Sequence, residues 1–191
     1  MSAAHSTYVS RVVDHAPSEA FLEAVTPILR LVSDAGLSYR PFELASDGAP
    51  LPRRVRVYLW SMTTHEAERQ PGAYKIQLTG LARRNQRGHF NLSDEAFVVV
   101  AGFNADLGVF ALWDPALHER EEGIPYSQNL QVLDGTLYRA MANGIAEQSR
   151  TLRGLGAGSS ETVVVASAEF LVGGLVVRWH RTLERLTGVK P

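Results

Sequence analysis

The chain has 191 residues, 45% of them hydrophobic, and a formal net charge of −1. A chain of this size and composition buries a stable core without covalent staples. It contains no cysteine, which excludes disulfides, thiolate metal sites and a cysteine nucleophile. No stretch approaches the roughly 18 consecutive apolar residues of a membrane span. A net charge near zero argues against a large nucleic-acid footprint, so any such interface must rest on a local charge cluster.

The first predicted element is a helix that begins near Pro17. Apolar residues recur at helical spacing from there to Val32, and Gly36 provides a stop. Pro27 interrupts the pattern, so a kink or break is expected at that point. Residues 38–53 contain three prolines and indicate an irregular connection with at most one short strand.

Four strands are predicted next, over residues 54–62, 74–79, 96–103 and 107–113. The second alternates apolar and polar side chains, as in a strand with one buried face. The first has an aliphatic face directed at the core and a half-polar aromatic face of Arg56, Tyr58 and Trp60, which suits packing under a helix or contact with a ligand. The third is almost wholly apolar, which predicts burial on both faces. The fourth follows a tight turn and is expected to pair with the third as a hairpin.

The remaining elements predict an α+β fold. A short strand is expected at 128–133, a helix from Asp134 to residue 152, a strand at 161–166 and a final helix at 168–186. Arg178, His180, Arg181 and Arg185 lie largely off the apolar stripe of that final helix. We expect a mainly antiparallel central sheet of about five to six strands, flanked by helices from both termini. Residues 1–16 form an N-terminal lead and 17–191 a single domain.

The densest positive cluster lies between the second and third strands. It comprises Arg83, Arg84, Asn85, Gln86, Arg87 and His89, with Gly88 among them. Arginines on a loop suit phosphate contacts, while Asn and Gln side chains can contact base edges. The alternative is a solvated surface loop, because Asp94 and Glu95 follow closely and offset part of the charge.

Aromatic residues on the predicted sheet suggest a second candidate site. Trp60, Tyr74 and Trp113 would form a pocket for a flipped base if their strands were adjacent, with Asp114 accepting a hydrogen bond from a base amino group. The alternative is ordinary packing, because aromatic residues in strands usually belong to the core.

Asp114 and His118 lie four residues apart in the segment WDPALHE. On a helical turn they would share a face and could ligate a metal or form an orienting hydrogen bond. Two ligands do not make a catalytic zinc site, which usually has three. The simpler role is structural, with Asp114 capping the turn ahead of Pro115. No metal site is therefore assigned.

An endonuclease is the alternative enzyme class. The PD-(D/E)xK site needs carboxylates to hold a divalent cation and a lysine to position water. Lys75 lies on a predicted strand, but Ala73 occupies the position where the acid is needed. Asp106 and Asp114, or the loop acids Glu66 and Glu68, would have to supply the carboxylates, with Mg²⁺ as the only expected cofactor. This departure from the pattern weakens the nuclease interpretation.

Three blocks of the sequence resemble a known region. They are AYKIQLTG, then GVFALWDPALHE with YSQNLQV, and then GIAEQSRTLRGLG with ETVVVA. Together they are similar, over roughly residues 55–175, to a region of bacterial restriction and phage-defence proteins that accompanies HNH nucleases or methyltransferases. The resemblance implies a DNA-recognition module, with sensing of modified bases as one use. The chain has no HNH motif of its own.

The sequence therefore favours a non-catalytic DNA-binding module of a restriction or defence system. The expected partners are double-stranded DNA and a nuclease or methyltransferase chain, with a homodimer as a further arrangement. A cytoplasmic protein is expected, because the N-terminus lacks the layout of a signal peptide. The alternatives are a small Mg²⁺-dependent endonuclease and a protein-interaction subunit that uses the final helix.

Overall fold

The computed structural model describes residues 10–11, 14–26, 28–32, 36–64, 72–126, 128–152 and 160–188. Its helices are α1 (Ala16–Val25), α2 (Asp134–Asn143) and α3 (Leu171–Thr187), with short 3-10 turns η1 (Gly36–Ser38), η2 (Pro115–Leu117) and η3 (Ala168–Phe170). Its strands are β1 (Ser10–Arg11), β2 (Leu29–Leu31), β3 (Tyr39–Arg40), β4 (Phe42–Ser46), β5 (Arg54–Ser61), β6 (Ala73–Gln77), β7 (Phe97–Asn104), β8 (Val109–Trp113), β9 (Asn129–Leu133), β10 (Ile145–Thr151) and β11 (Ser160–Ser167).

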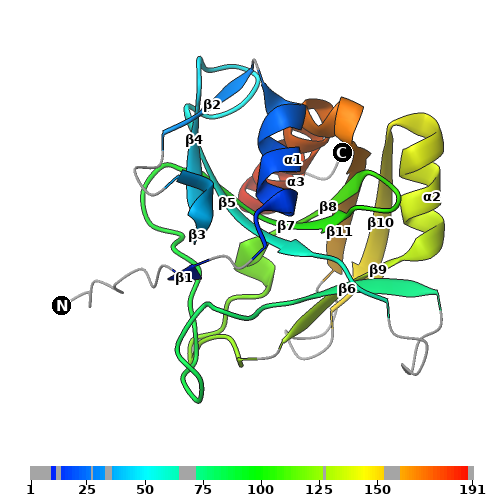
Figure 1. Cartoon of the computed structure of the whole chain (residues 1–191). Coiled ribbons are helices and arrows are strands. Elements are labelled where there is room, and N and C mark those ends of the chain that lie inside the picture. Colours follow the sequence, from blue (N-terminus) through cyan, green and yellow to red (C-terminus); the bar gives the residue numbers. More distant parts are fainter. Residues whose placement is uncertain are drawn as a thin grey trace.

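A seven-stranded sheet forms the centre of the fold, in the order β10-β11-β8-β7-β5-β4-β2 (Figure 1). Among the described strands of this sheet only β5 and β7 pair in parallel, and the other neighbours are antiparallel. The α+β class is confirmed, and so is the β7–β8 hairpin. The expected strand number of about five to six was too low, because both edge strands arise from segments whose sequence indicated helix.

The strand β6 does not join the main sheet as the sequence suggested. It pairs antiparallel with β9 in a separate two-stranded sheet that lies against one face of the large one. This excursion between β5 and β7 explains their parallel pairing, because parallel neighbours need a long crossover connection. In the expected N-terminal lead, β1 pairs with β3, while residues 1–9 lie outside the described range.

Alternate residues of the central strands pack into two separate hydrophobic cores, one on each face of the sheet. One core lies under α1 and α3, and the other lies under β6, β9 and α2. The strand β7 contributes to both, so the predicted burial of this strand on both faces is confirmed. The first core includes Phe21, Phe42, Val57, Val99, Phe110, Leu112 and Leu175, and the second includes Tyr58, Trp60, Ile76, Val100, Trp113, Leu130, Val165 and Leu137.

The first helix is shorter than its apolar spacing predicts. It ends at Val25, and Leu29–Leu31 then pairs with β4 as an edge strand. Helical spacing was misleading here because Ile28 and Val32 are 53% and 43% exposed, whereas Leu29 is buried. Pro27, where the kink or break was expected, lies outside the described residues.

The predicted helix from Asp134 to residue 152 is also wrong in its second half. The helix ends at Asn143, and Gly144 (φ 84°) redirects the chain into the edge strand β10. Besides this left-handed geometry, a Cβ at Gly144 would lie 2.7 Å from the Phe170 ring. Ile145 and Leu152 continue the helical spacing that begins at Leu137. The sequence pattern therefore gave no sign that the helix ends at Asn143.

Candidate functional site

The candidate interface is the exposed loop of residues 82–88, here called the arginine loop. It projects at the lower end of the view in Figure 1. The side chains of Arg83, Arg84, Asn85, Gln86 and Arg87 are all exposed. The loop turns because Gln86 N donates to Arg83 O at 3.0 Å and Asn85 adopts φ 69°, a left-handed conformation that asparagine tolerates well.

A second chain segment, residues 119–124, fixes the base of the arginine loop. Gly88 and Ile124 exchange two backbone hydrogen bonds, of 3.0 and 2.7 Å. Arg87 Nη1 donates to Gly123 O at 3.0 Å. Neither Gly88 nor Gly123 has room for a side chain, because an added Cβ would collide with Leu81 or with His89. These contacts anchor the base of the arginine loop to the neighbouring segment.

Buried groups hold the chain that leaves the arginine loop. The Glu119 carboxylate accepts from Phe90 N at 2.9 Å and from His89 Nδ1 at 2.5 Å. Arg56, which is 3% exposed, donates to Asn91 O at 2.8 Å and to Asp94 at 3.0 Å. His89 thus belongs to the anchored base of the loop, as does the guanidinium of Arg87, whereas Arg83 and Arg84 lie beyond it.

Asp94, one of the two acids expected to offset the charge of the arginine loop, is engaged by other arginines. Asp94 pairs with Arg56 at 3.0 Å and with Arg54 at 3.8 Å, and the hydrogen bond from Arg56 lowers the pKa of Asp94. Arg83 and Arg84 form no ion pair with any residue that the structure describes. Their charge therefore remains available to a ligand.

The aromatic residues proposed for a base pocket are packed in the second core. The premise of adjacent strands is wrong, because β7 lies between β5 and β8 and β6 belongs to another sheet. Trp113 is fully buried and Trp60 is 5% exposed. Trp60 Nε1 donates to Thr79 O at 3.1 Å, and the Arg40 guanidinium lies 4.1 Å from its ring centre. Tyr74 is partly exposed at the margin of the same core.

The residues proposed for a nuclease site are not brought together. Asp106 lies in the exposed β7–β8 turn, and Asp114 lies beyond the opposite end of β8. The five residues of β8 separate the two carboxylates by about 17 Å along the strand. Lys75 lies on β6, in the smaller sheet. Among the described residues no group of three or more acids or histidines could hold a metal ion, and Glu66 and Glu68 lie outside them.

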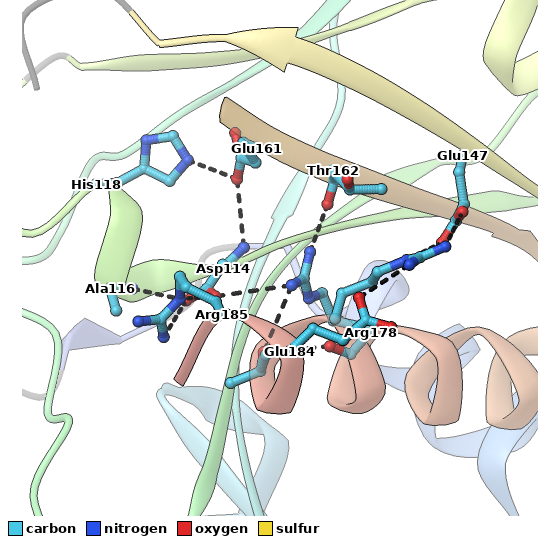
Figure 2. Close-up of polar contacts among 11 residues, drawn as sticks. Asp114, Ala116, His118, Glu147, Glu161, Thr162, Arg178, Glu184 and Arg185 are labelled. Carbon is cyan, nitrogen blue, oxygen red and sulfur yellow. Dashed lines mark hydrogen bonds and ion pairs between the residues drawn. The ribbon is translucent and has the colours of Figure 1, made fainter. Parts of the chain in front are cut away.

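Asp114 instead enters a buried network of ion pairs (Figure 2). Its Oδ1 accepts from Ala116 N at 3.1 Å, which caps η2 as the sequence predicted. Its Oδ2 accepts from Arg185 Nε at 2.8 Å and lies 3.7 Å from Arg178. Arg178 is buried, so its expected place off the apolar stripe of the last helix is wrong. The carboxylate of Asp114 thus joins α3 to the end of β8.

Glu161 is the second buried acid of the network and was not identified from the sequence. Its side chain is fully buried and accepts from His118 Nε2 and Arg150 Nε, each at 2.9 Å. Burial alone would raise the pKa of Glu161, but the hydrogen bond and charge of His118, together with Arg150 and Arg178, lower it overall. Glu161, Val163 and Val165 are alternate residues of one strand, so their side chains point to the same, inward face. A charged residue on that face was the feature of the sequence that could have identified Glu161.

The fold and these contacts define an α+β protein with an exposed arginine loop that is anchored at its base and with a buried ion network. No helix in the described ranges is long and apolar enough to cross a membrane. The chain belongs to the family described as Methylase-associated X1 (MTaX1), whose match covers residues 53–173. No curated protein and no solved structure matches it.

The family match confirms the coarser part of the resemblance seen in the sequence, namely a tie to methyltransferase-associated proteins. The matched residues include the arginine loop, residues 119–124 and Glu161. They exclude α1 and nearly all of α3. The candidate interface therefore lies within the family region, while one helical layer lies beyond it.

Proposed function

We propose that this protein is a DNA-binding module of a bacterial restriction-modification or defence system and works beside a DNA methyltransferase. The observation that carries the proposal is the arginine loop, which presents three exposed arginines on a base fixed by hydrogen bonds. The Methylase-associated X1 family supports the restriction-modification context. A methylase partner would supply the chemistry, and this chain would supply contact with the duplex.

The roles follow from side-chain chemistry. Arg83, Arg84 and Arg87 contact phosphates, because a guanidinium donates in a fork that matches a phosphate. Asn85 and Gln86, which lie at the turn between them, contact base edges, because amide side chains can both donate to and accept from bases. We assign no base pocket to Trp60 and Trp113, since their rings are taken up by the core. Recognition of a modified base would therefore also fall to the loop.

A fluorescence-anisotropy titration of the full chain with a mixed-sequence duplex, at 50 and 200 mM salt, tests the proposal. Three phosphate contacts give a slope of about −2.7 in log affinity against log salt, so affinity is expected to fall about 40-fold between the two conditions. Absence of binding, or binding that does not respond to salt, would overturn the proposal. The same mixture with Mg²⁺ tests the alternative nuclease; we expect intact DNA, because the nuclease candidates Asp106 and Asp114 lie far apart.

A further inference from the structure

The chain that enters the arginine loop is held by an arginine from outside it, Arg40 on the strand β3. Arg40 Nε donates to Leu59 O at 2.7 Å, and its Nη1 donates at 3.3 Å to Thr79 O, just ahead of the loop. The guanidinium also lies over the Trp60 ring, 4.1 Å from the ring centre. Two carbonyl oxygens and an aromatic face therefore fix this guanidinium in position.

No carboxylate in the described ranges neutralises Arg40. Its contacts with described residues are the two carbonyl hydrogen bonds and the ring contact, and they include no ion pair. Burial lowers the pKa of Arg40 to about 10, so the guanidinium still carries its charge at pH 7. Charges that are taken out of water are usually paired with an opposite charge. The described part of the chain thus fixes a cation without supplying its counter-charge.

Arg87, at the other end of the arginine loop, is held in the same way. Among the arginines whose side chains the structure describes, only Arg40 and Arg87 donate to backbone carbonyl oxygens without also pairing with a carboxylate. Arg56, Arg150 and Arg178 also donate to carbonyl oxygens, but each has an acid as a further partner. Two fixed and uncompensated cations therefore bracket the exposed tip of the loop.

The nitrogen Nη2 of Arg40 is open to a ligand. It forms no hydrogen bond with any residue that the structure describes. It is also not among the buried side-chain atoms that lack a partner, whereas Nε of Arg178 is, so Nη2 reaches solvent. A guanidinium nitrogen with free hydrogens is a strong donor to a phosphate oxygen. Because the rest of the side chain is already fixed, binding through Nη2 would order little more of it.

We propose that Arg40 contacts a phosphate of the same duplex that the arginine loop binds, so that the interface extends from the loop to β3. The ligand is the sugar-phosphate backbone of duplex DNA, and the contact is independent of base sequence. Both β3 and the arginine loop lie on the left of the view in Figure 1, whereas α2 lies on the right. Arg40 lies outside the matched family region, residues 53–173. This inference rests on the proposed DNA binding.

The test compares Arg40→Met with wild type in the anisotropy titration at 50 and 200 mM salt. Methionine can still pack on Trp60 but removes the charge. One phosphate contact contributes about 0.9 to the magnitude of the slope of log affinity against log salt concentration, so the affinity of the variant should fall about 3.5-fold less than that of wild type between the two conditions. Arg40→Lys keeps the charge and should keep the slope of wild type.

Arg139→Met is the matched control. Arg139 is exposed on α2, donates to Thr136 Oγ1 at 3.0 Å and pairs with no acid in the described ranges, so its loss removes the same charge elsewhere. Its salt slope should equal that of wild type. An unchanged slope in Arg40→Met, or an equal change in Arg139→Met, would overturn the Arg40 contact and leave the proposed DNA binding intact.

A second measurement needs only the wild-type protein to fold with its methionine variant set aside. The side-chain Nε–Hε resonance of Arg40, assigned by its loss in Arg40→Lys, should shift when a mixed-sequence duplex is added to the isotope-labelled full chain. A resonance that does not move while the duplex is bound would overturn the contact, since a purely structural Arg40 is not expected to sense DNA. Failure of wild type to bind any duplex would instead refute the proposed function, and this inference with it.

Discussion

Glu161→Gln is expected to lower the free energy of unfolding by about 3 kcal/mol. The substitution keeps the size of the side chain but removes the negative charge that faces His118 and Arg150, each 2.9 Å away. The carboxylate is fully buried and the His118 side chain is 5% exposed, so water has little access to replace the lost contact with the imidazole. Breaking a buried ion pair on one side commonly costs several kcal/mol, since it leaves a charge without compensation.

A matched control exists in the same protein. Glu147 accepts two hydrogen bonds of 2.8 and 2.9 Å from Arg181, yet its side chain is 31% exposed. Glu147→Gln should therefore change stability by less than about 1 kcal/mol, as exposed pairs do. Urea unfolding at pH 7 measures both variants. Equal, small changes in the two midpoints would contradict a structural role for the buried network.

The same carboxylate predicts how stability depends on pH. The pKa of Glu161 is lowered by folding from its ordinary value of 4.5, so its ionised form stabilises the folded state. That contribution is complete above pH 4.5 and is lost as the pH falls through the lower, folded-state pKa. The difference in unfolding free energy between wild type and Glu161→Gln should shrink on acidification below pH 4.5.

The Arg83→Ala/Arg84→Ala/Arg87→Ala protein is expected to lose most of its salt-dependent DNA affinity. Removing three phosphate contacts lowers the magnitude of the slope of log affinity against log salt concentration by about 2.7. The ratio of dissociation constants at 200 and 50 mM salt should fall from about 40 towards 1. The chain should still fold, because all three side chains are exposed, although the variant also loses the hydrogen bond from Arg87 Nη1 to Gly123 O at the base of the loop. The anisotropy titration described above measures the effect.

The control for this variant removes the same charge elsewhere. Arg30, Arg53 and Arg139 are exposed on β2, ahead of β5 and on α2. Their triple alanine variant has the same net charge as the loop variant, so a general electrostatic effect would appear in both. Equal loss of affinity in the two proteins would show that binding follows net charge and not the arginine loop.

The strands that the sequence predicted correctly are those in which the pattern of apolar side chains matches the faces that are buried. The run at 97–104 is apolar because both of its faces are covered, and the alternation in Arg54–Ser61 separates two cores. The edge strands β2 and β10 were missed because their apolar residues happen to continue a helical spacing. There Gly144 was the decisive residue, and its backbone geometry is not visible in a periodicity.

The arginine loop and the ion network differ in how much of each could be predicted from the sequence. The arginine loop is contiguous, so its composition alone identified it. The ion network joins residues distant in sequence, since Glu161 meets His118 across 43 positions and Arg185 meets Asp114 across 71. The packing of α3 against the sheet brings Arg185 to Asp114, while the pairing of β10 with β11 places Arg150 opposite Glu161. The proposed aromatic pocket depended in the same way on strand order, which separates the strands of Trp60, Tyr74 and Trp113.

The central claim is that the arginine loop contacts duplex DNA. The most direct measurement is a map of backbone amide chemical-shift changes in the isotope-labelled full chain as a mixed-sequence duplex is added. If the arginine loop contacts DNA, the largest changes fall within residues 82–90 and 119–124, and the signals of α1 and α3 stay unchanged. Changes centred on α3 or on the edge strand β2, with the arginine loop unaffected, would contradict it.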